Sequence, residues 1–188
     1  MSFFKTEKEF EDQIYNYILS NRYNPINQRE VLGVCRQPSL GGYGVADLIT
    51  LEKHGEREVI NVIELKNVPF QAGMIFQVGR YLAAVRMACN YEKLNSNILN
   101  FEAAGEVKKI FENADVIGSL VCTECRDITH GVSAVCSMLS INVFSSSMEM
   151  LSVSFEQMTS NADYDINDIP LIQSSISCLS THFDNLPF

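Results

Sequence analysis

The 188-residue sequence contains no tryptophan and only five prolines, and its 14 Lys and Arg residues are outnumbered by 23 Asp and Glu residues. The resulting formal net charge of −9 excludes a broad cationic surface for non-specific phosphate contacts. Long apolar runs are absent too. The longest uncharged stretch, residues 128–148, is interrupted by His130, Gly131, Asn142 and several Ser and Thr residues. Such a stretch is too polar to cross a bilayer, so we expect no membrane partner.

The N-terminal residues MSFFKTEKEFED lack the basic-then-apolar order of a secretory signal. Six cysteines at ordinary spacing therefore predict reduced thiols in a cytoplasmic protein. The length corresponds to about one domain, and 46% hydrophobic with 20% charged residues is typical of a globular chain. We expect a domain over residues 1–155, followed by a tail over 156–188 that is rich in Asn, Asp and Ser and has no assignable pattern.

Hydrophobic periodicity predicts helices interleaved with strands. A helix over 6–20 has its apolar stripe at Phe10, Ile14, Tyr17 and Ile18, and Thr6 with Glu9 forms a capping box. Strands are expected over 29–34, 45–51, 58–65, 115–123 and, as a strand or hairpin, 141–155; helices over 71–89, 101–113 and 129–139; a glycine-rich turn over 39–44 and a polar turn over 52–57. The strand over 58–65 is almost wholly apolar, which predicts burial on both faces. The order is that of an α/β layered domain with a mixed sheet.

Charged residues interrupt two of these apolar strands. Asp47 is the single charge in the strand over 45–51, and the strand over 58–65 ends in Glu64 and Leu65, followed directly by Lys66. Strand alternation puts Glu64 and Lys66 on the same face, and an antiparallel hairpin can bring Asp47 beside Glu64.

Such a cluster has a direct chemical use. A buried acid is costly unless it is paired or bound to a metal. A small set of carboxylate oxygens suits Mg²⁺ or Mn²⁺. An adjacent ammonium, here that of Lys66, can hold an attacking water and offset the charge that develops at a phosphodiester.

This constellation resembles the PD-(D/E)xK nuclease superfamily, over about residues 7–85. The core motif of that family matches Asp47 and the triplet Glu64-Leu65-Lys66, with Ala46 where the family often has proline. A later helix in the family often carries Gln followed by Arg-Tyr, which Gln77, Arg80 and Tyr81 match. Additional acids of the family correspond to Glu11 on the first helix, with Glu7 as the alternative, and to Glu30 on the first strand.

The resemblance implies a restriction-endonuclease-like three-layer core, with a mixed central β-sheet flanked by helices. It also implies Mg²⁺-dependent phosphodiester hydrolysis, with Mn²⁺ as a substitute. In this reading Asp47, Glu64 and the carbonyl of Leu65 bind the metal, and Lys66 positions or deprotonates the water. Gln77 is catalytic, and Arg80 and Tyr81 contact the substrate. The implied partner is nucleic acid, DNA more than RNA, with a homodimer or larger assembly as a further expectation.

Each feature also has a structural explanation. Asp47, Glu64 and Lys66 can form a partly buried ion cluster at a sheet end. Gln77, Arg80 and Glu11 can face water on helices. Glu30 can pair with Arg29 or a neighbouring strand. The functional alternative is a nuclease-fold protein without catalysis that binds nucleic acid or protein as a regulatory or inhibitory module, or a structural subunit of a complex.

The cysteines allow a zinc hypothesis. Cys122, Cys125, His130 and Cys136 have ligand types of a zinc site, but the first ends a buried strand and the last lies near a helical apolar stripe. Buried thiols explain both positions, because cysteine is among the most buried residue types. A redox pair of Cys122 and Cys125 lacks the strand-to-helix turn of thioredoxins.

The helix over 71–89 contains Arg80 and Arg86, and no Asp or Glu occurs between Gln71 and Tyr91. Together with Lys66 this predicts a small cationic face beside the acids. Contacts with nucleic acid are therefore expected to be confined, with a shallow dependence on salt concentration.

Overall fold

The computed structural model describes residues 4–90, 115–126, 128–149 and 152–159. Within these ranges a seven-stranded sheet has the strand order β1-β2-β3-β4-β5-β6-β7. The strands are β1 (Tyr23–Asn24), β2 (Arg29–Arg36), β3 (Leu48–His54), β4 (Arg57–Pro69), β5 (Asp115–Glu124), β6 (Ile141–Glu149) and β7 (Ser152–Gln157). The helices are α1 (Glu7–Asn21), the 3₁₀ turn η1 (Gly41–Tyr43), α2 (Gly73–Asn90) and α3 (His130–Leu139).

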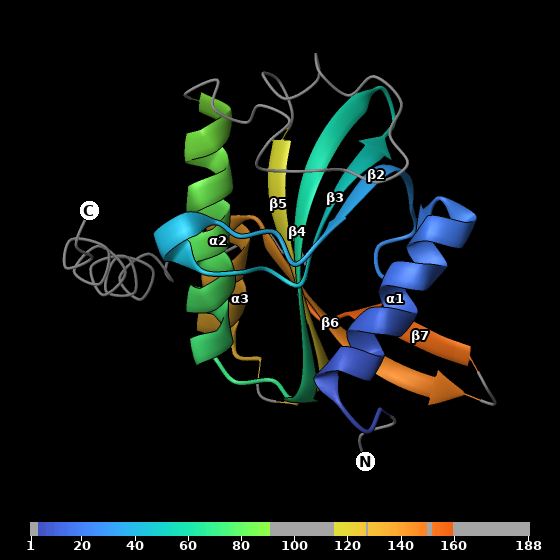
Figure 1. Ribbon diagram of the computed structural model, residues 1–188. Coiled ribbons are helices and arrows are strands. Elements are labelled where there is room, and N and C mark those ends of the chain that lie inside the picture. The colour runs from blue at the N-terminus through green and yellow to red at the C-terminus, as the bar shows by residue number, and fades with distance from the viewer. Residues whose placement is uncertain (1–3, 91–114, 127, 150–151, 160–188) are drawn as a thin grey trace.

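Helix α1 covers one face of the sheet, and α2 and α3 cover the other (Figure 1). Strands β1 to β4 pair antiparallel, β5 and β6 continue in parallel, and β7 returns antiparallel to β6. The parallel neighbours require crossovers, which contain α2 and α3. This mixed sheet between helical layers confirms the expected α/β architecture of the restriction-endonuclease-like fold.

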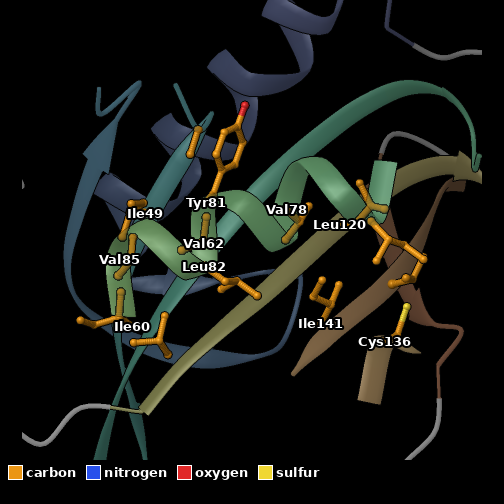
Figure 2. Close-up of a cluster of buried hydrophobic side chains, with 14 of the residues drawn as sticks. Ile49, Ile60, Val62, Val78, Tyr81, Leu82, Val85, Leu120, Cys136 and Ile141 are labelled. Atoms are coloured by element: carbon orange, nitrogen blue, oxygen red, sulfur yellow. The ribbon is translucent and has the colours of Figure 1, made fainter. Parts of the chain in front are cut away.

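The core has two parts, one on each face of the sheet. One lies between the sheet and α2 and α3, and Figure 2 shows part of it. The other lies between the sheet and α1. Strand β4 supplies both: Ile60 and Val62 belong to the first, and Ile63 and Leu65 to the second. The prediction that this strand is buried on both faces is confirmed.

Helix α1 begins as the sequence predicts. The hydroxyl of Thr6 accepts a hydrogen bond from the backbone N–H of Glu9 at 3.1 Å, and the Glu9 carboxylate accepts from the backbone N–H of Lys5 at 2.9 Å. The predicted burial of Tyr17 is wrong, since this residue is 45% exposed. The helix instead turns Glu11 towards the sheet, because the carboxylate of Glu11 finds an ion-pair partner there.

The polar turn expected over 52–57 is shorter than predicted. Strands β3 and β4 pair as far as His54 opposite Arg57, so Glu52 lies inside the sheet with 0% exposure. The prediction was wrong because the donors that compensate this carboxylate come from several segments. They are Asn24 at 2.6 Å, Asn27 at 2.6 Å, Thr50 at 2.6 Å and Asn61 at 3.0 Å.

The remaining elements follow the expected order. Thr129 caps α3, and the segment expected as a strand or hairpin is the β6–β7 pair, which runs to Gln157. The helix predicted over 101–113 and most of the tail over 156–188 lie outside the described residues. Every helix in the described ranges is too short or too polar to span a lipid bilayer.

Candidate active site

Asp47 and Glu64 lie on neighbouring antiparallel segments. Leu48 pairs with Ile63 at the start of β3, which places Asp47 alongside Glu64 in the middle of β4. The backbone N–H of Leu65 donates to Oδ2 of Asp47 at 2.7 Å. The hairpin therefore brings the two acids together, as strand alternation predicted.

Glu64 is the most deeply buried member of the cluster, at 1% exposure. Its Oε1 accepts hydrogen bonds from Nζ of Lys66 at 2.7 Å and from Nε2 of Gln77 at 2.6 Å. Its Oε2 is buried and has no hydrogen-bond partner. An unpaired, buried carboxylate oxygen is costly unless a further group compensates it.

The two carboxylates disfavour each other's ionisation. Burial raises the pKa of Asp47 to about 7, and the charge of Glu64 adds to the rise, against the opposing effects of the Leu65 N–H and of Lys66. Burial also raises the pKa of Glu64, which the hydrogen bond from Lys66 opposes. A proton or a cation between the acids relieves this repulsion.

Lys66 contacts two acids, one on its own strand and one on helix α1. Its Nζ lies 3.0 Å from Oε1 of Glu7 on α1, in addition to its contact with Glu64. Burial alone lowers the pKa of Lys66, but the hydrogen bonds and charges of Glu64 and Glu7 raise it overall. The side chain is consequently an ammonium at neutral pH.

Gln77 links Glu64 to Tyr81. Besides contacting Glu64, its Nε2 donates to the hydroxyl oxygen of Tyr81 at 2.9 Å. The ring of Tyr81 lies among the core side chains, with its hydroxyl pointing away from them (Figure 2). Gly44 has a φ of +113°, and a Cβ there would lie 3.1 Å from Cε1 of Tyr81. Glycine is thus required for this close approach.

Arg80 is half-buried on α2 and has no ion-pair partner in the part of the chain that the structure describes. Its charge opposes the rise in the Tyr81 pKa that burial causes. The expectation that Arg86 shares this cationic face with Arg80 is wrong. Its Nη2 donates to the carbonyls of Val116 at 2.9 Å and Leu139 at 3.0 Å.

Glu11 is 4% exposed rather than solvated. Its carboxylate accepts from Nε of Arg36 at 2.5 Å and from Nε2 of Gln37 at 3.0 Å. The backbone N–H of Gln37 also donates to the carbonyl of Asp47 at 2.8 Å. The charge of Glu11 contributes to the raised pKa of Asp47, so Glu11 lies within electrostatic range of the cluster.

Glu30 is not brought to the cluster. It pairs across the sheet with Lys53, whose Nζ lies 3.9 Å from the Glu30 carboxylate. Lys53 is roughly 17 Å further along β3 than Leu48. The structural explanation, pairing with a neighbouring strand, accounts for Glu30.

The donor set fits a divalent cation of the magnesium type. Among residues 4–90, 115–126, 128–149 and 152–159, no three His, Cys, Asp or Glu side chains form a group that could hold a metal. Mg²⁺ commonly uses one or two carboxylates and keeps several waters. Asp47 and Glu64 supply such a pair, and the unpartnered Oε2 of Glu64 is the atom that a cation would satisfy.

The cysteines give no zinc site within the described ranges. Cys122, Cys125 and Cys136 are free, buried thiols, and all three belong to the core beside α2. Burial in this core explains their positions.

Sequence reasoning missed Arg36 and Gln37, the pair that holds Glu11. Arg36 is the last residue of β2, and Gln37 follows it. The sequence around these two residues gives no sign that they contact α1, which lies earlier in the chain. The available signal was Glu11 itself, since a charge on the buried stripe of a helix requires a partner.

No protein-family model matches the sequence. No curated protein matches it. Among solved structures, a repair endonuclease from Pyrococcus abyssi matches with a TM-score of 0.44 and 17% identity, over 76% of this chain and 47% of that one. The structure of an EndoMS–dsDNA2 complex matches with a TM-score of 0.41 and 16% identity, over 71% of this chain and 42% of that one. The chain thus spans less than half the length of either structure.

Proposed function

We propose that the protein is a metal-dependent nuclease of the PD-(D/E)xK type, which hydrolyses phosphodiester bonds of nucleic acid. One observation carries the proposal. Two mutually repelling carboxylates, Asp47 and Glu64, lie beside the ammonium of Lys66, and the buried Oε2 of Glu64 has no hydrogen-bond partner. An ion cluster that served only stability would be expected to pair its buried atoms.

Asp47 and Glu64, with the carbonyl of Leu65, would hold Mg²⁺ or Mn²⁺. When bound, the cation supplies Lewis-acid stabilisation of the phosphate oxygens and binds water close to the phosphorus. The protein contributes a fixed pair of carboxylates: the Leu65 N–H holds Asp47, and Gln77 holds Glu64. This geometry is preorganised by the hairpin rather than by a mobile loop.

Lys66 acts as an ammonium in this mechanism. Its raised pKa favours orienting water and stabilising negative charge over accepting a proton. Arg80, without an acidic partner in the described segments, is available for a phosphate oxygen. Tyr81 acts through Gln77, because its hydroxyl accepts from the same Nε2 that holds Glu64.

The test is cleavage of labelled single-stranded, double-stranded and branched DNA and of RNA, each with Mg²⁺, Mn²⁺ or EDTA. DNA is the polymer expected to be cut, with activity lost in EDTA. Asp47→Ala and Lys66→Ala should each lower the rate by at least about 100-fold with the fold retained. Glu30→Ala is the control, since Glu30 pairs with Lys53 away from the cluster.

Unchanged cleavage in both purified variants would refute the assignment. Cation binding without cleavage of any polymer would favour the non-catalytic alternative, a nuclease fold used as a binding module. The expected dimer or larger assembly is tested on the same samples by sedimentation.

A further inference from the structure

The ammonium of Lys66 links Glu7 on α1 to Glu64 on β4. Strand alternation directs Lys66 to the same face as Glu64, which contacts Gln77 on α2. Yet Nζ also lies 3.0 Å from Glu7 on α1, which covers the opposite face (Figure 1). The side chain must therefore reach over the end of the sheet.

The start of α1 is fixed at this end of the sheet. Nδ2 of Asn67, the residue after Lys66, donates to the carbonyl of Phe4 at 2.7 Å. The Phe4 ring stacks on Phe10 with a centroid distance of 4.4 Å and is buried. These contacts hold the start of α1, which carries Glu7, against the part of β4 that carries Lys66.

We propose that Glu7 is a positioning residue that holds the ammonium of Lys66 for the proposed hydrolysis. This inference rests on the proposed function. Oε1 of Glu64 is shared between Lys66 and Gln77, and a cation at Oε2 would draw on the same negative charge. Glu7 is then the remaining acid that can hold the flexible four-carbon side chain of Lys66 in place.

Structural stabilisation does not explain the contact with Glu7. The Glu7 side chain is 45% exposed, and pairs of this exposure contribute little to stability. A loss of activity on removing its charge therefore reports on Lys66 rather than on folding. Glu9, in the same first turn, is the matched control, because its carboxylate contacts the Lys5 backbone instead.

The experiment compares Glu7→Gln with Glu9→Gln in full-length protein, on the nucleic acid that the wild type cleaves best. Glu7→Gln should lower kcat roughly tenfold, the effect of one lost charge-assisted contact, with KM and the half-saturating Mg²⁺ concentration unchanged. Glu9→Gln should leave all three unchanged. In urea unfolding, Glu7→Gln should shift the midpoint no more than Glu9→Gln does, because so exposed a pair contributes little to stability.

Equal kcat in the Glu7 and Glu9 variants, with an active wild type, would overturn the inference and leave the proposed function standing. A weaker Mg²⁺ response in Glu7→Gln would overturn it as well, by assigning Glu7 to the cation instead of to Lys66. A midpoint loss in Glu7→Gln well beyond that of Glu9→Gln would overturn it too, by assigning Glu7 to folding. A wild type inert on every polymer would overturn the proposed function, and this inference with it.

Discussion

The backbone N–H of Leu65 donates a hydrogen bond to Oδ2 of Asp47 at 2.7 Å, which joins a carboxylate just before β3 to the backbone of β4. This bond lowers the pKa of Asp47, but burial and the neighbouring Glu64 outweigh it. The fold therefore holds an acid in a site that disfavours its charge, and the consequences are measurable.

The first concerns pH. Asp47 titrates at about 7 in the folded protein, above its unfolded value of about 4, so the folded state holds the proton more tightly. In EDTA, stability should fall as pH rises from about 4 to about 7, by on the order of 3 kcal/mol, and then level off. Urea unfolding at pH 5 and pH 8 measures this. Asp47→Asn should remove most of the difference, and an unchanged pH dependence in that variant would contradict the assignment.

The second concerns cations. Mg²⁺ or Mn²⁺ should raise the melting temperature of the wild type, because a ligand of the folded state stabilises it by about 2.7 kcal/mol at 100 times its Kd. The shift should be larger at pH 8 than at pH 6, since the cation competes with a proton on Asp47. Asp47→Asn and Glu64→Gln should abolish the response in thermal-shift measurements, whereas Glu30→Gln should retain it. Equal shifts in all variants would place the cation elsewhere.

The third concerns Gly44. The Cβ of an alanine at this position would lie against the Tyr81 ring. The backbone φ of +113° is also one that residues with a side chain rarely adopt. Gly44→Ala should destabilise the fold by about 1–3 kcal/mol and reduce cleavage, because Tyr81 shares Gln77 with Glu64. Gly42→Ala is the control, since a Cβ at position 42 meets nothing within 4 Å. Urea unfolding and cleavage rates check both variants, and matching behaviour would argue against the close approach.

The fourth concerns Arg80. Fluorescence anisotropy of labelled DNA in EDTA, at several salt concentrations, should give a shallow slope of log affinity against log salt. Arg80→Gln should reduce the magnitude of that slope by about one unit, the contribution of one phosphate contact. Arg57→Gln changes the same charge at the far end of β4, where Arg57 pairs with Asp115, and should have no effect. A steep slope that Arg80→Gln leaves unaltered would mean that other residues carry the phosphate contacts.

The fifth concerns Glu52, whose carboxylate is fully buried and accepts from Asn24, Asn27, Thr50 and Asn61. In Glu52→Gln, the new NH₂ group would face the NH₂ groups of the asparagines and could not accept their hydrogen bonds. The variant should lose about 3–5 kcal/mol of unfolding free energy. Glu56→Gln, in the exposed hairpin turn, should change it by less than about 0.5 kcal/mol. A Glu52→Gln variant of wild-type stability would show that the network is dispensable.

The sequence by itself determined the features that depend on local pattern. The cap at Thr6, the doubly buried strand that contains Glu64, and the antiparallel hairpin beside Asp47 follow from periodicity and alternation, although the strand continues past Lys66 to Pro69. These depend on neighbours a few residues apart, or on one hairpin whose register the apolar pattern fixes.

Only the tertiary structure decided which distant groups compensate the charges. Arg36 pairs with Glu11, Glu7 reaches Lys66, and three asparagines from separate segments bind Glu52. It also left Tyr17 exposed beside the buried stripe of α1, and directed Arg86 towards backbone carbonyls. The partners of long polar side chains are the groups that lie within a few ångströms of them after folding. Packing across the whole sheet determines which groups these are, and the periodicity of the sequence carries no information about that packing.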